Sequence, residues 1–419
     1  MNNKLMVIKN ISWLLLEHSI RIIAGVVTAS ILARVLGVEG YGIFQYILGL
    51  VVIFKSLSYV NSAEIMVPKL ANANIVERKS LMGSGFFIRS LFCAIAYLAF
   101  LLFIYFNNDI NNDINIFYLA VILGFSILVD EAFGIITAFL QSQTMIKYRS
   151  ILYIIFVIIR VSFLGFLYLL NITNIYFYAL IYALESISMA IGLFLVYKIL
   201  NKDLFFTFNI DKILSLLKDG LPFFVGIVFM CVFWRIDIVM TKFLSDDTTL
   251  GLYASAIQLF SSITAMAPII ATSFAPLFVY KFDNIRIIKK HIWFLGFVML
   301  GIAICSATII YFLSPILINI IFGSKFDDAA DIFRYLLYIL PFIFLNEALN
   351  LYIIKMKLGK ISICKWGLAL SSAIVAYIYF IPLYKAIGTV IGLGIGYFVA
   401  CIFGIFVIIA IGKPNNRLL

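Results

Sequence analysis

The sequence carries little charge for its length. Only 12% of its 419 residues are Asp, Glu, Lys or Arg, whereas 64% are hydrophobic. A soluble domain has about 25% charged residues and 45–50% apolar ones, so a soluble fold would leave much of this apolar surface in water. Segments of alternating apolar and polar residues are also absent, which excludes an outer-membrane barrel. The composition therefore predicts an integral membrane protein.

Patterns that bind metals or cofactors are equally scarce. The five cysteines all lie in apolar runs, and no two of them form a Cys-x-x-Cys pair. The two histidines, His18 and His291, have no metal-ligand partner nearby in the sequence. We therefore expect no disulfide framework, no metal and no cofactor. The basic residues are spread over many loops, which also argues against a nucleic-acid partner.

Long apolar runs dominate the chain instead. About twelve of them contain about 20 residues, enough for a helix to cross the ~30 Å hydrocarbon core. They cover residues 10–33, 41–63, 83–106, 116–139, 150–170, 175–198, 221–244, 250–279, 292–313, 331–353, 361–382 and 387–411. We therefore predict an all-α integral membrane protein.

The middle of the chain divides these spans into two sets of six. The segment NKDLFFTFNIDKILSLLKDG alternates apolar side chains with lysines, as an interfacial amphipathic helix does. We predict an N-terminal six-helix bundle at residues 1–200, an amphipathic cytoplasmic linker at 201–219 and a C-terminal six-helix bundle at 220–419. A weak internal repeat, RVLGVEGYGIF at 34–44 and KFLSDDTTLGLYASA at 242–256, agrees with two pseudo-symmetric halves around a central cavity.

The loops differ strongly in basic residues. One set of alternate loops, in which we include Arg149 and Lys365, carries 21 Lys and Arg, and the opposite set carries 4. Because basic loops stay in the cytoplasm, this bias places both termini there, facing anionic membrane lipids.

Six basic residues fall inside the predicted spans: Arg21, Lys55, Arg89, Arg160, Arg235 and Arg334. Facing lipid, they would together cost on the order of 15–20 kcal/mol. They must therefore line a polar cavity, pair with acids or extend to an interface. Arg334 lies near the outer end of its span, and the other five are candidates for binding an anionic substrate. For Lys55 and Arg89, extension to the inner interface is an alternative.

Five acidic residues in the spans are candidates for cation coupling: Asp130, Glu131, Asp237, Glu185 and Glu347. The adjacent carboxylates in LVDEAFG resist joint ionisation at low dielectric, which suits a proton or sodium relay. Structural pairing of these two with Arg160 or Arg21 is the alternative.

Two further spacings predict contacts. Glu17 and Arg21 are four residues apart and can pair along one helix face. Arg235 and Asp237, in FWRIDIVM, are two apart and cannot share a face. We expect one of them to line the cavity and the other to contact a neighbouring helix of its bundle, or Asp237 to serve only in orienting helices.

The order of several motifs points to a family. LARVLGVEGYGIF (32–44), DGLPFFVG (219–226), LGLYASA (250–256) and IIFGSKFDDAADIFR (320–334) resemble the bacterial O-antigen flippase family Wzx. That family belongs to the polysaccharide-exporter branch of the MOP superfamily, which has the MATE-like fold. The resemblance extends over nearly the whole chain.

The resemblance implies a transporter and not an enzyme. It would move undecaprenyl-diphosphate-linked O-antigen oligosaccharide from the cytoplasmic to the periplasmic leaflet of the inner membrane during lipopolysaccharide biosynthesis. Alternating access with cation coupling, and contact with the O-antigen polymerase and the chain-length machinery, are further implications. The alternatives are an exporter of capsular or teichuronic polysaccharide or of lipid II, a MATE-type drug antiporter, and a membrane glycan polymerase.

Overall fold

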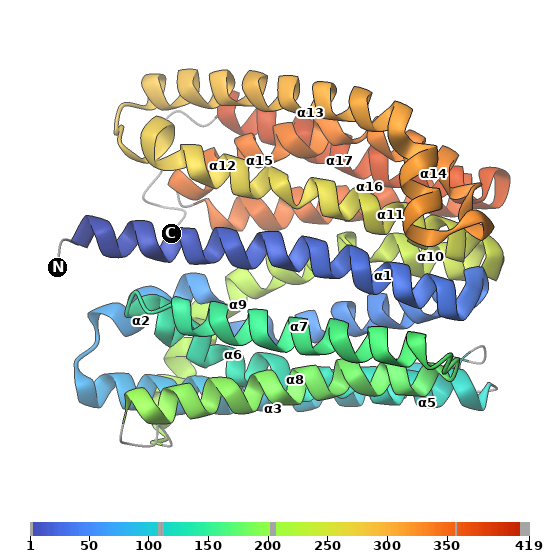
Figure 1. The fold of residues 1–419 in the computed structure, drawn as a ribbon. Coiled ribbons are helices and arrows are strands. Elements are labelled where there is room, and N and C mark those ends of the chain that lie inside the picture. Colours follow the sequence, from blue (N-terminus) through green and yellow to red (C-terminus); the bar gives the residue numbers. More distant parts are fainter. Residues whose placement is uncertain (1–2, 108–109, 111–112, 202–206, 357, 411–419) are drawn as a thin grey trace. The chain divides into compact units, whose positions relative to one another are not determined.

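The computed structural model describes residues 3–107, 110, 113–201, 207–356 and 358–410, and these residues form helices and short connections (Figure 1). Among them, nine helices are long and apolar enough to span a membrane, or eleven if each of two bent pairs counts as one span. The first, Leu15–Asn72, would be ~87 Å long if straight, far more than one crossing requires. Gly37 breaks it at φ 71° into two helical parts, each long enough for one crossing. Counted in this way, the described residues agree with the twelve predicted spans.

The chain forms two compact units. Unit 1 comprises Met1–Leu36 and Ile47–Cys231, and unit 2 comprises Gly37–Tyr46 and Val232–Leu419. The predicted linker, 201–219, lies ahead of this boundary. Its residues 202–206 are outside the described part, and from Ile210 onward it is already part of a helix that continues into the next span.

Unit 1 contains the helices from blue to yellow-green in Figure 1, apart from the blue segment Gly37–Tyr46. They are α1 (Asn3–Lys55, without its segment Gly37–Tyr46), η1 (Ser56–Asn61), α2 (Ala63–Asn72), α3 (Ile75–Phe106), α5 (Ile114–Gly124), α6 (Ser126–Ser142), α7 (Lys147–Leu169), α8 (Ile175–Leu200) and most of α9 (Ile210–Phe233). Its core lies where α6 packs against α2, α3 and α8. Leu216 of α9 is fully buried in this core, with Ile213 and Leu217 packed beside it. The apolar face of the amphipathic segment therefore binds protein.

Unit 2 contains the helices from yellow-green to red in Figure 1. They are α10 (Ile236–Leu244), α11 (Asp247–Thr264), α12 (Met266–Ala275), η2 (Pro276–Tyr280), α13 (Ile285–Phe322), η3 (Ser324–Phe326), α14 (Ala329–Leu337), α15 (Leu340–Lys355), α16 (Gly359–Tyr384) and α17 (Ala386–Ala410). The glycines of α17 at positions 388, 392 and 396 permit close packing on α16, because a Cβ at Gly392 would lie 2.3 Å from the Tyr377 ring.

The two repeated segments lie against each other within unit 2. A Cβ on Gly251 would lie 2.0 Å from the Val38 carbonyl oxygen, and one on Gly42 would lie 2.7 Å from the Gly251 nitrogen. The hydroxyl of Thr248 donates to Glu39 at 2.9 Å. Segment 37–46, although flanked on both sides by unit 1 helices, is therefore packed as part of unit 2.

The turn before α11 is held by its N-cap. The Asp246 carboxylate accepts from the Thr249 backbone N–H at 2.8 Å and from Lys385 Nζ at 2.9 Å. These bonds, the backbone one foremost, lower the pKa of Asp246 from its ordinary 3.8 to about 2. The carboxylate therefore stays ionised, and its contribution to stability stays present, at every pH well above 4.

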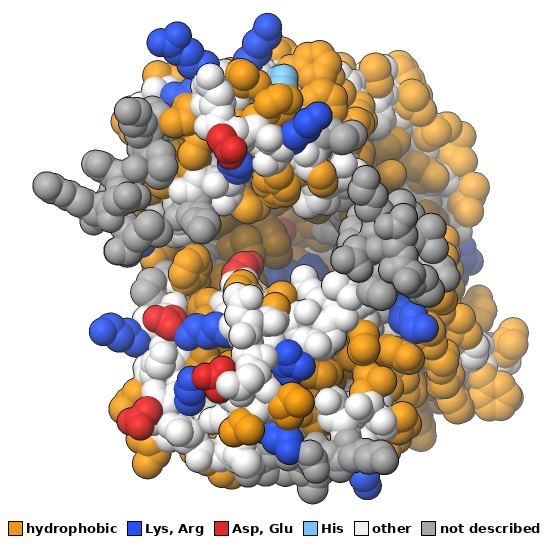
Figure 2. Space-filling view, turned by 90° about the vertical axis from the view of Figure 1, so that its left-hand side faces the viewer, with side chains coloured by type: hydrophobic (Ala, Val, Ile, Leu, Met, Phe, Trp, Pro, Cys, Tyr) orange, Lys and Arg blue, Asp and Glu red, His pale blue; other side chains and the backbone are white. Residues whose placement is uncertain are grey.

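Figure 2 looks onto the end of the molecule at which α1 begins, and Lys and Arg side chains are scattered over this face. The prediction that Lys365 belongs to this group of loop lysines is wrong. Lys365 is fully buried in α16, because that helix begins at Gly359 and turns the side chain inward.

Candidate functional site

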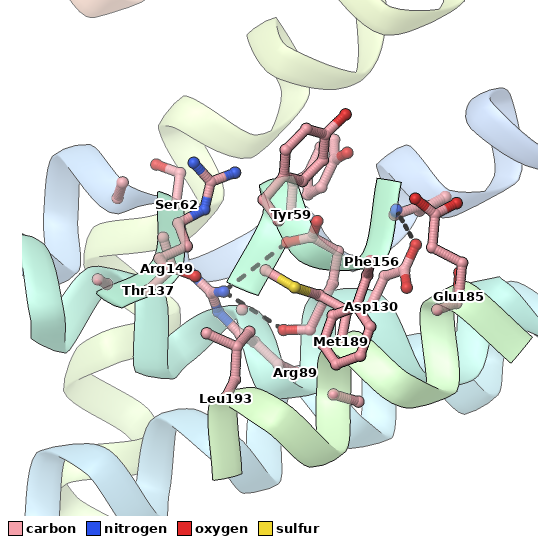
Figure 3. Close-up of a pocket in the computed structure, with 18 of the residues that line it drawn as sticks. Tyr59, Ser62, Arg89, Asp130, Thr137, Arg149, Phe156, Glu185, Met189 and Leu193 are labelled. Atoms are coloured by element: carbon pink, nitrogen blue, oxygen red, sulfur yellow. Dashed lines mark hydrogen bonds and ion pairs between the residues drawn. The ribbon is translucent and has the colours of Figure 1, made fainter. Parts of the chain in front are cut away.

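Unit 1 encloses a cavity of about 600 Å³ with a strongly charged lining (Figure 3). The charged residues of its wall are Arg21, Lys55, Glu64, Arg89, Asp130, Glu131, Arg149, Arg160 and Glu185. Tyr59, Ser62 and Tyr153 add hydroxyl groups, and Phe156, Met189 and Leu193 add apolar surface. This volume lies in the range of small-molecule binding sites.

Helical periodicity brings the charged side chains to one place. Arg149, Tyr153, Phe156 and Arg160 recur every three or four residues and form one face of α7. Helix α8 presents Glu185, Met189 and Leu193 in the same way, and α6 presents Asp130, Gly134 and Thr137. Helix α1 contributes Arg21 and Lys55, and α3 contributes Arg89. The charged lining of the cavity thus consists of side chains that lie along one face of each of several otherwise apolar helices.

Three of the five cations are matched with one carboxylate each. Lys55 Nζ lies 2.5 Å from Asp130 Oδ2, and Arg160 Nη1 lies 2.6 Å from Glu185 Oε2. Arg89 Nη1 lies 3.7 Å from Glu131 Oε2 and donates to the Glu131 carbonyl at 3.3 Å. Arg89 also donates to the Asn61 carbonyl at the end of η1. In Figure 3, dashed lines mark the contacts that Arg89 makes with Glu131 and the contact between Asp130 and Lys55.

The other two cations share a single carboxylate. Arg21 Nη2 and Arg149 Nη1 each lie 2.7 Å from the same oxygen, Glu17 Oε1, while the Ser150 hydroxyl donates to Oε2 at 2.8 Å. Glu17 is fully buried, but the side chains of Arg21 and Arg149 are 43% and 24% exposed. The Tyr153 ring supports Arg21, whose Cζ lies 4.5 Å from the ring centroid. Both guanidinium groups therefore keep donors free to face the cavity.

The five cations of the wall thus have four carboxylates as direct partners. Glu64, the remaining acid of the lining, is exposed in the first turn of α2, where water screens it. At the Arg21–Arg149 pair, two cations therefore share one carboxylate, whereas each of the other three has its own. An anion bound there would receive hydrogen bonds from two guanidinium groups.

Seven of the ten predicted site residues line this cavity: Arg21, Lys55, Arg89, Arg160, Asp130, Glu131 and Glu185. The predicted pairing of Glu17 with Arg21 is confirmed. The predicted partners of Asp130 and Glu131, Arg160 or Arg21, are wrong. Consecutive residues of a helix point about 100° apart, so the two carboxylates reach Lys55 of α1 and Arg89 of α3 instead.

The other three predicted residues belong to unit 2. Arg235 is at the break between α9 and α10, as the N-cap of α10, where the sequence predicted one continuous span. Asp237 is buried and accepts from the Tyr253 hydroxyl of α11 at 2.7 Å, so the predicted contact with a neighbouring helix is confirmed for the aspartate. Glu347 lies in α15 and accepts from the side chain of Asn350.

Sequence reasoning missed the role of Arg149. Because Arg149 directly follows the predicted loop, the sequence places it among the inner-loop cations. Its spacing of eleven residues from Arg160, three helical turns, was a signal that both residues face the same way.

No group of three or more His, Cys, Asp or Glu side chains that could hold a metal ion occurs in the described part of the chain. The five cysteines are free. The charged side chains of the cavity form ion pairs, an arrangement suited to electrostatic binding.

Comparisons with known proteins agree with these features. The family model described as "Polysaccharide biosynthesis protein" matches residues 7–282. The comparison with curated proteins finds no match. Among solved structures, the chain is similar to the lipid II flippase MurJ in an inward closed conformation, with a TM-score of 0.70 and 16% identity over 95% of this chain and 87% of that one.

Two further structures share the fold. An inward-facing multidrug resistance MATE family transporter of the MOP superfamily has a TM-score of 0.67 and 11% identity, covering 94% of each chain. A MOP superfamily transporter from Pyrococcus furiosus has a TM-score of 0.60 and 14% identity, covering 96% of each chain. At these identities the likeness shows the fold alone, which is the MATE-like fold predicted from the sequence.

Proposed function

Because the chain belongs to the polysaccharide biosynthesis protein family, we propose that it is a flippase for a lipid-linked oligosaccharide in a bacterial inner membrane. Its substrate would be an oligosaccharide joined through diphosphate to undecaprenol, the O-antigen precursor being our first candidate. Transport would proceed by alternating access from the cytoplasmic to the periplasmic leaflet. The fold shared with the lipid II flippase MurJ supports this class of transporter.

The observation that carries the proposal is the sharing of Glu17 by Arg21 and Arg149. A diphosphate is the one strongly anionic part common to substrates of this class. Guanidinium groups bind phosphate oxygens through two parallel hydrogen bonds and remain charged at all physiological pH values. Since one carboxylate cannot neutralise two cations, the pair attracts a further anion.

Release is as necessary as binding in a transporter. Each of the remaining cations of the cavity already has a carboxylate partner, so the lining does not form an unbroken cationic cage. The headgroup would then be held mainly at one end, by Arg21 and Arg149. The hydroxyl groups of Tyr59, Ser62 and Tyr153 are suited to hydrogen bonding with sugars.

The Arg21–Arg149 pair also separates this proposal from its main rival. A multidrug transporter of the same fold would bind organic cations, which two adjacent guanidinium groups repel. A lipid II or capsular precursor carries the same diphosphate, so those substrates are distinguished by their sugars. We retain Asp130, Glu131 and Glu185, with Asp237 and Glu347 in unit 2, as candidates for cation coupling, and Arg235 as a candidate for substrate contact.

The decisive experiment measures flipping of undecaprenyl-diphosphate-linked oligosaccharides by purified protein in proteoliposomes. Arg21→Ala and Arg149→Ala should each reduce headgroup affinity about tenfold or more, since a hydrogen bond to a charged group contributes about 1.5–3 kcal/mol. Arg→Lys at either position should restore only part of it, because an ammonium keeps the charge and loses the second parallel bond.

Lys147→Ala is the matched control, because Lys147 is exposed two residues before Arg149 on the same helix. It should flip as the unaltered protein does. Normal flipping by both arginine variants would refute the proposed headgroup site, and efflux of a cationic dye without lipid flipping would favour the drug-transporter alternative.

We also propose that both termini are cytoplasmic, and single cysteines in a cysteine-free background test this. Cysteine in place of Asp328 or Thr173 should react with a membrane-impermeant thiol reagent supplied from the periplasm. Cysteine in place of Ala71 or Asp283 should react only after the cells are opened. All four positions are exposed, so lack of reaction reports the side of the membrane and not burial. The reverse pattern would invert the orientation.

A further inference from the structure

Unit 2 contains a second charged cluster, made by neighbouring helices α15 and α16. The Lys365 side chain in α16 is fully buried and donates from Nζ to Oδ1 of Asn350 in α15. Glu347, one turn earlier in α15, accepts at Oε1 from Nδ2 of Asn350 and of Asn346, each at 3.4 Å. One amide therefore joins an ammonium at one end to a carboxylate at the other.

The surroundings contain little other charge. Cys401 and Tyr397 of α17 are the other titratable side chains with an electrostatic influence on the cluster. The Cys401 thiol donates to the Phe342 carbonyl at 3.0 Å, and Lys365 Nζ lies 5.1 Å from the Trp366 ring centroid. Among the described residues, no carboxylate lies within ion-pair distance of Lys365. The hydrogen-bond link between Lys365 and Glu347 thus runs through Asn350.

We propose that Glu347, Asn350 and Lys365 form a proton-binding site that excludes sodium ions. Glu347 is partly exposed while Lys365 is completely buried, so the carboxylate is the more accessible end of the cluster. Adding H⁺ to a Glu347 carboxylate oxygen changes the charge of the cluster from zero to +1. The role of this site in transport rests on the proposed flippase function, for which the bound proton would be the coupling ion.

Exclusion of sodium follows from the same geometry. A sodium ion binds through several oxygens, and the one that Asn350 offers already accepts from the lysine. A second cation beside the resident ammonium would be strongly repelled in a low-dielectric interior. Lys365 therefore occupies the place of a bound metal cation.

If Lys365 takes the place of a metal cation, removing its charge should allow sodium to bind. In Lys365→Met, the oxygens of Glu347 and Asn350 lose their cation. Asn346 Oδ1, buried and without a hydrogen-bond partner in the described structure, is a third oxygen beside them. We expect the melting temperature of purified Lys365→Met to rise when choline chloride is replaced by sodium chloride, because an ion that binds only the folded state stabilises it. The unaltered protein should show no such rise.

Two variants control this measurement. Lys360→Met removes an exposed lysine of the same helix and should remain insensitive to sodium. The double variant Glu347→Gln/Lys365→Met removes both charges and should also be insensitive. A sodium-dependent rise in the unaltered protein, or its absence in folded Lys365→Met, would overturn the proposal.

Proton binding, the second part of the proposal, is tested by counting protons. The comparison uses only the double variant, in which neither charge is left without its partner. Unbuffered samples of the unaltered protein and of the double variant are acidified from pH 6.5 to pH 4. The unaltered protein should take up about one more proton per chain, by the linkage between binding and charge. Cys401 and Tyr397 are present in both proteins and cancel. Equal uptake would refute proton binding, whatever the result of the flipping assay.

Discussion

Glu17→Ala is expected to prevent accumulation of the protein in the membrane. The carboxylate is fully buried and accepts hydrogen bonds from Arg21, Arg149 and Ser150, so it links α1 to α7. Its removal leaves two guanidinium groups close together without a counter-charge. Breaking a buried pair in this way costs about 3–5 kcal/mol, and the partial exposure of both arginines places the cost near the lower end. Immunoblots of membranes and melting of detergent-solubilised protein measure the loss.

A second-site variant shows whether charge imbalance or lost packing causes the poor accumulation of Glu17→Ala. Glu17→Ala/Arg149→Ala leaves only one uncompensated cation, the partly exposed Arg21, and should accumulate better than Glu17→Ala alone. If the double variant accumulates as poorly as the single one, the carboxylate stabilises through its shape and its bond to Ser150. Normal levels of Glu17→Ala would show that the shared carboxylate is not needed for the arginine arrangement.

Gly251→Ala is expected to have a comparable effect in unit 2. The added methyl group would lie 2.0 Å from the Val38 carbonyl oxygen and 2.6 Å from its carbon, which are backbone atoms. No rotamer change can relieve such a contact, so segment 37–46 must separate from α11. Overpacking of this kind costs about 1–3 kcal/mol, and a clash with backbone lies at the upper end. The expected result is a lowered melting temperature together with reduced flipping.

Gly301→Ala provides the control, because a Cβ at this α13 position meets no atom within 4 Å. Within a helix, alanine is also preferred to glycine by about 1 kcal/mol, so this variant should be at least as stable as the unaltered protein. A Gly251→Ala protein with an unchanged melting temperature would contradict the close packing of the two repeated segments.

The sequence was sufficient for the apolar architecture. The number of spans follows from the length of apolar runs, which is a property of the chain read in one dimension. The close-packing role of Gly388, Gly392 and Gly396 could likewise be predicted, because a spacing of four keeps them on one helix face. The pair Glu17 and Arg21 is local in the same sense, since both residues lie on one helix.

The sequence alone could not predict which residues of different helices contact one another. Asp130 and Glu131 were assigned the wrong cations, Lys365 was placed in a loop and Arg149 was not recognised as part of the cavity. In each case the error concerns a helix boundary or the neighbour that a helix faces. A buried cation and one that extends to an interface have the same local sequence, and only the surrounding helices distinguish them.

By itself, then, the sequence determined that this protein spans a membrane many times, and which charged residues the bilayer would not accept on a lipid-facing surface. Only the tertiary structure decided that Arg21 and Arg149 share one buried carboxylate, and that residues 37–46 pack within unit 2. The reason is physical. Hydrophobic burial depends on composition summed along a run, whereas an ion pair depends on the rotation and spacing of two helices, which all their packed neighbours set together.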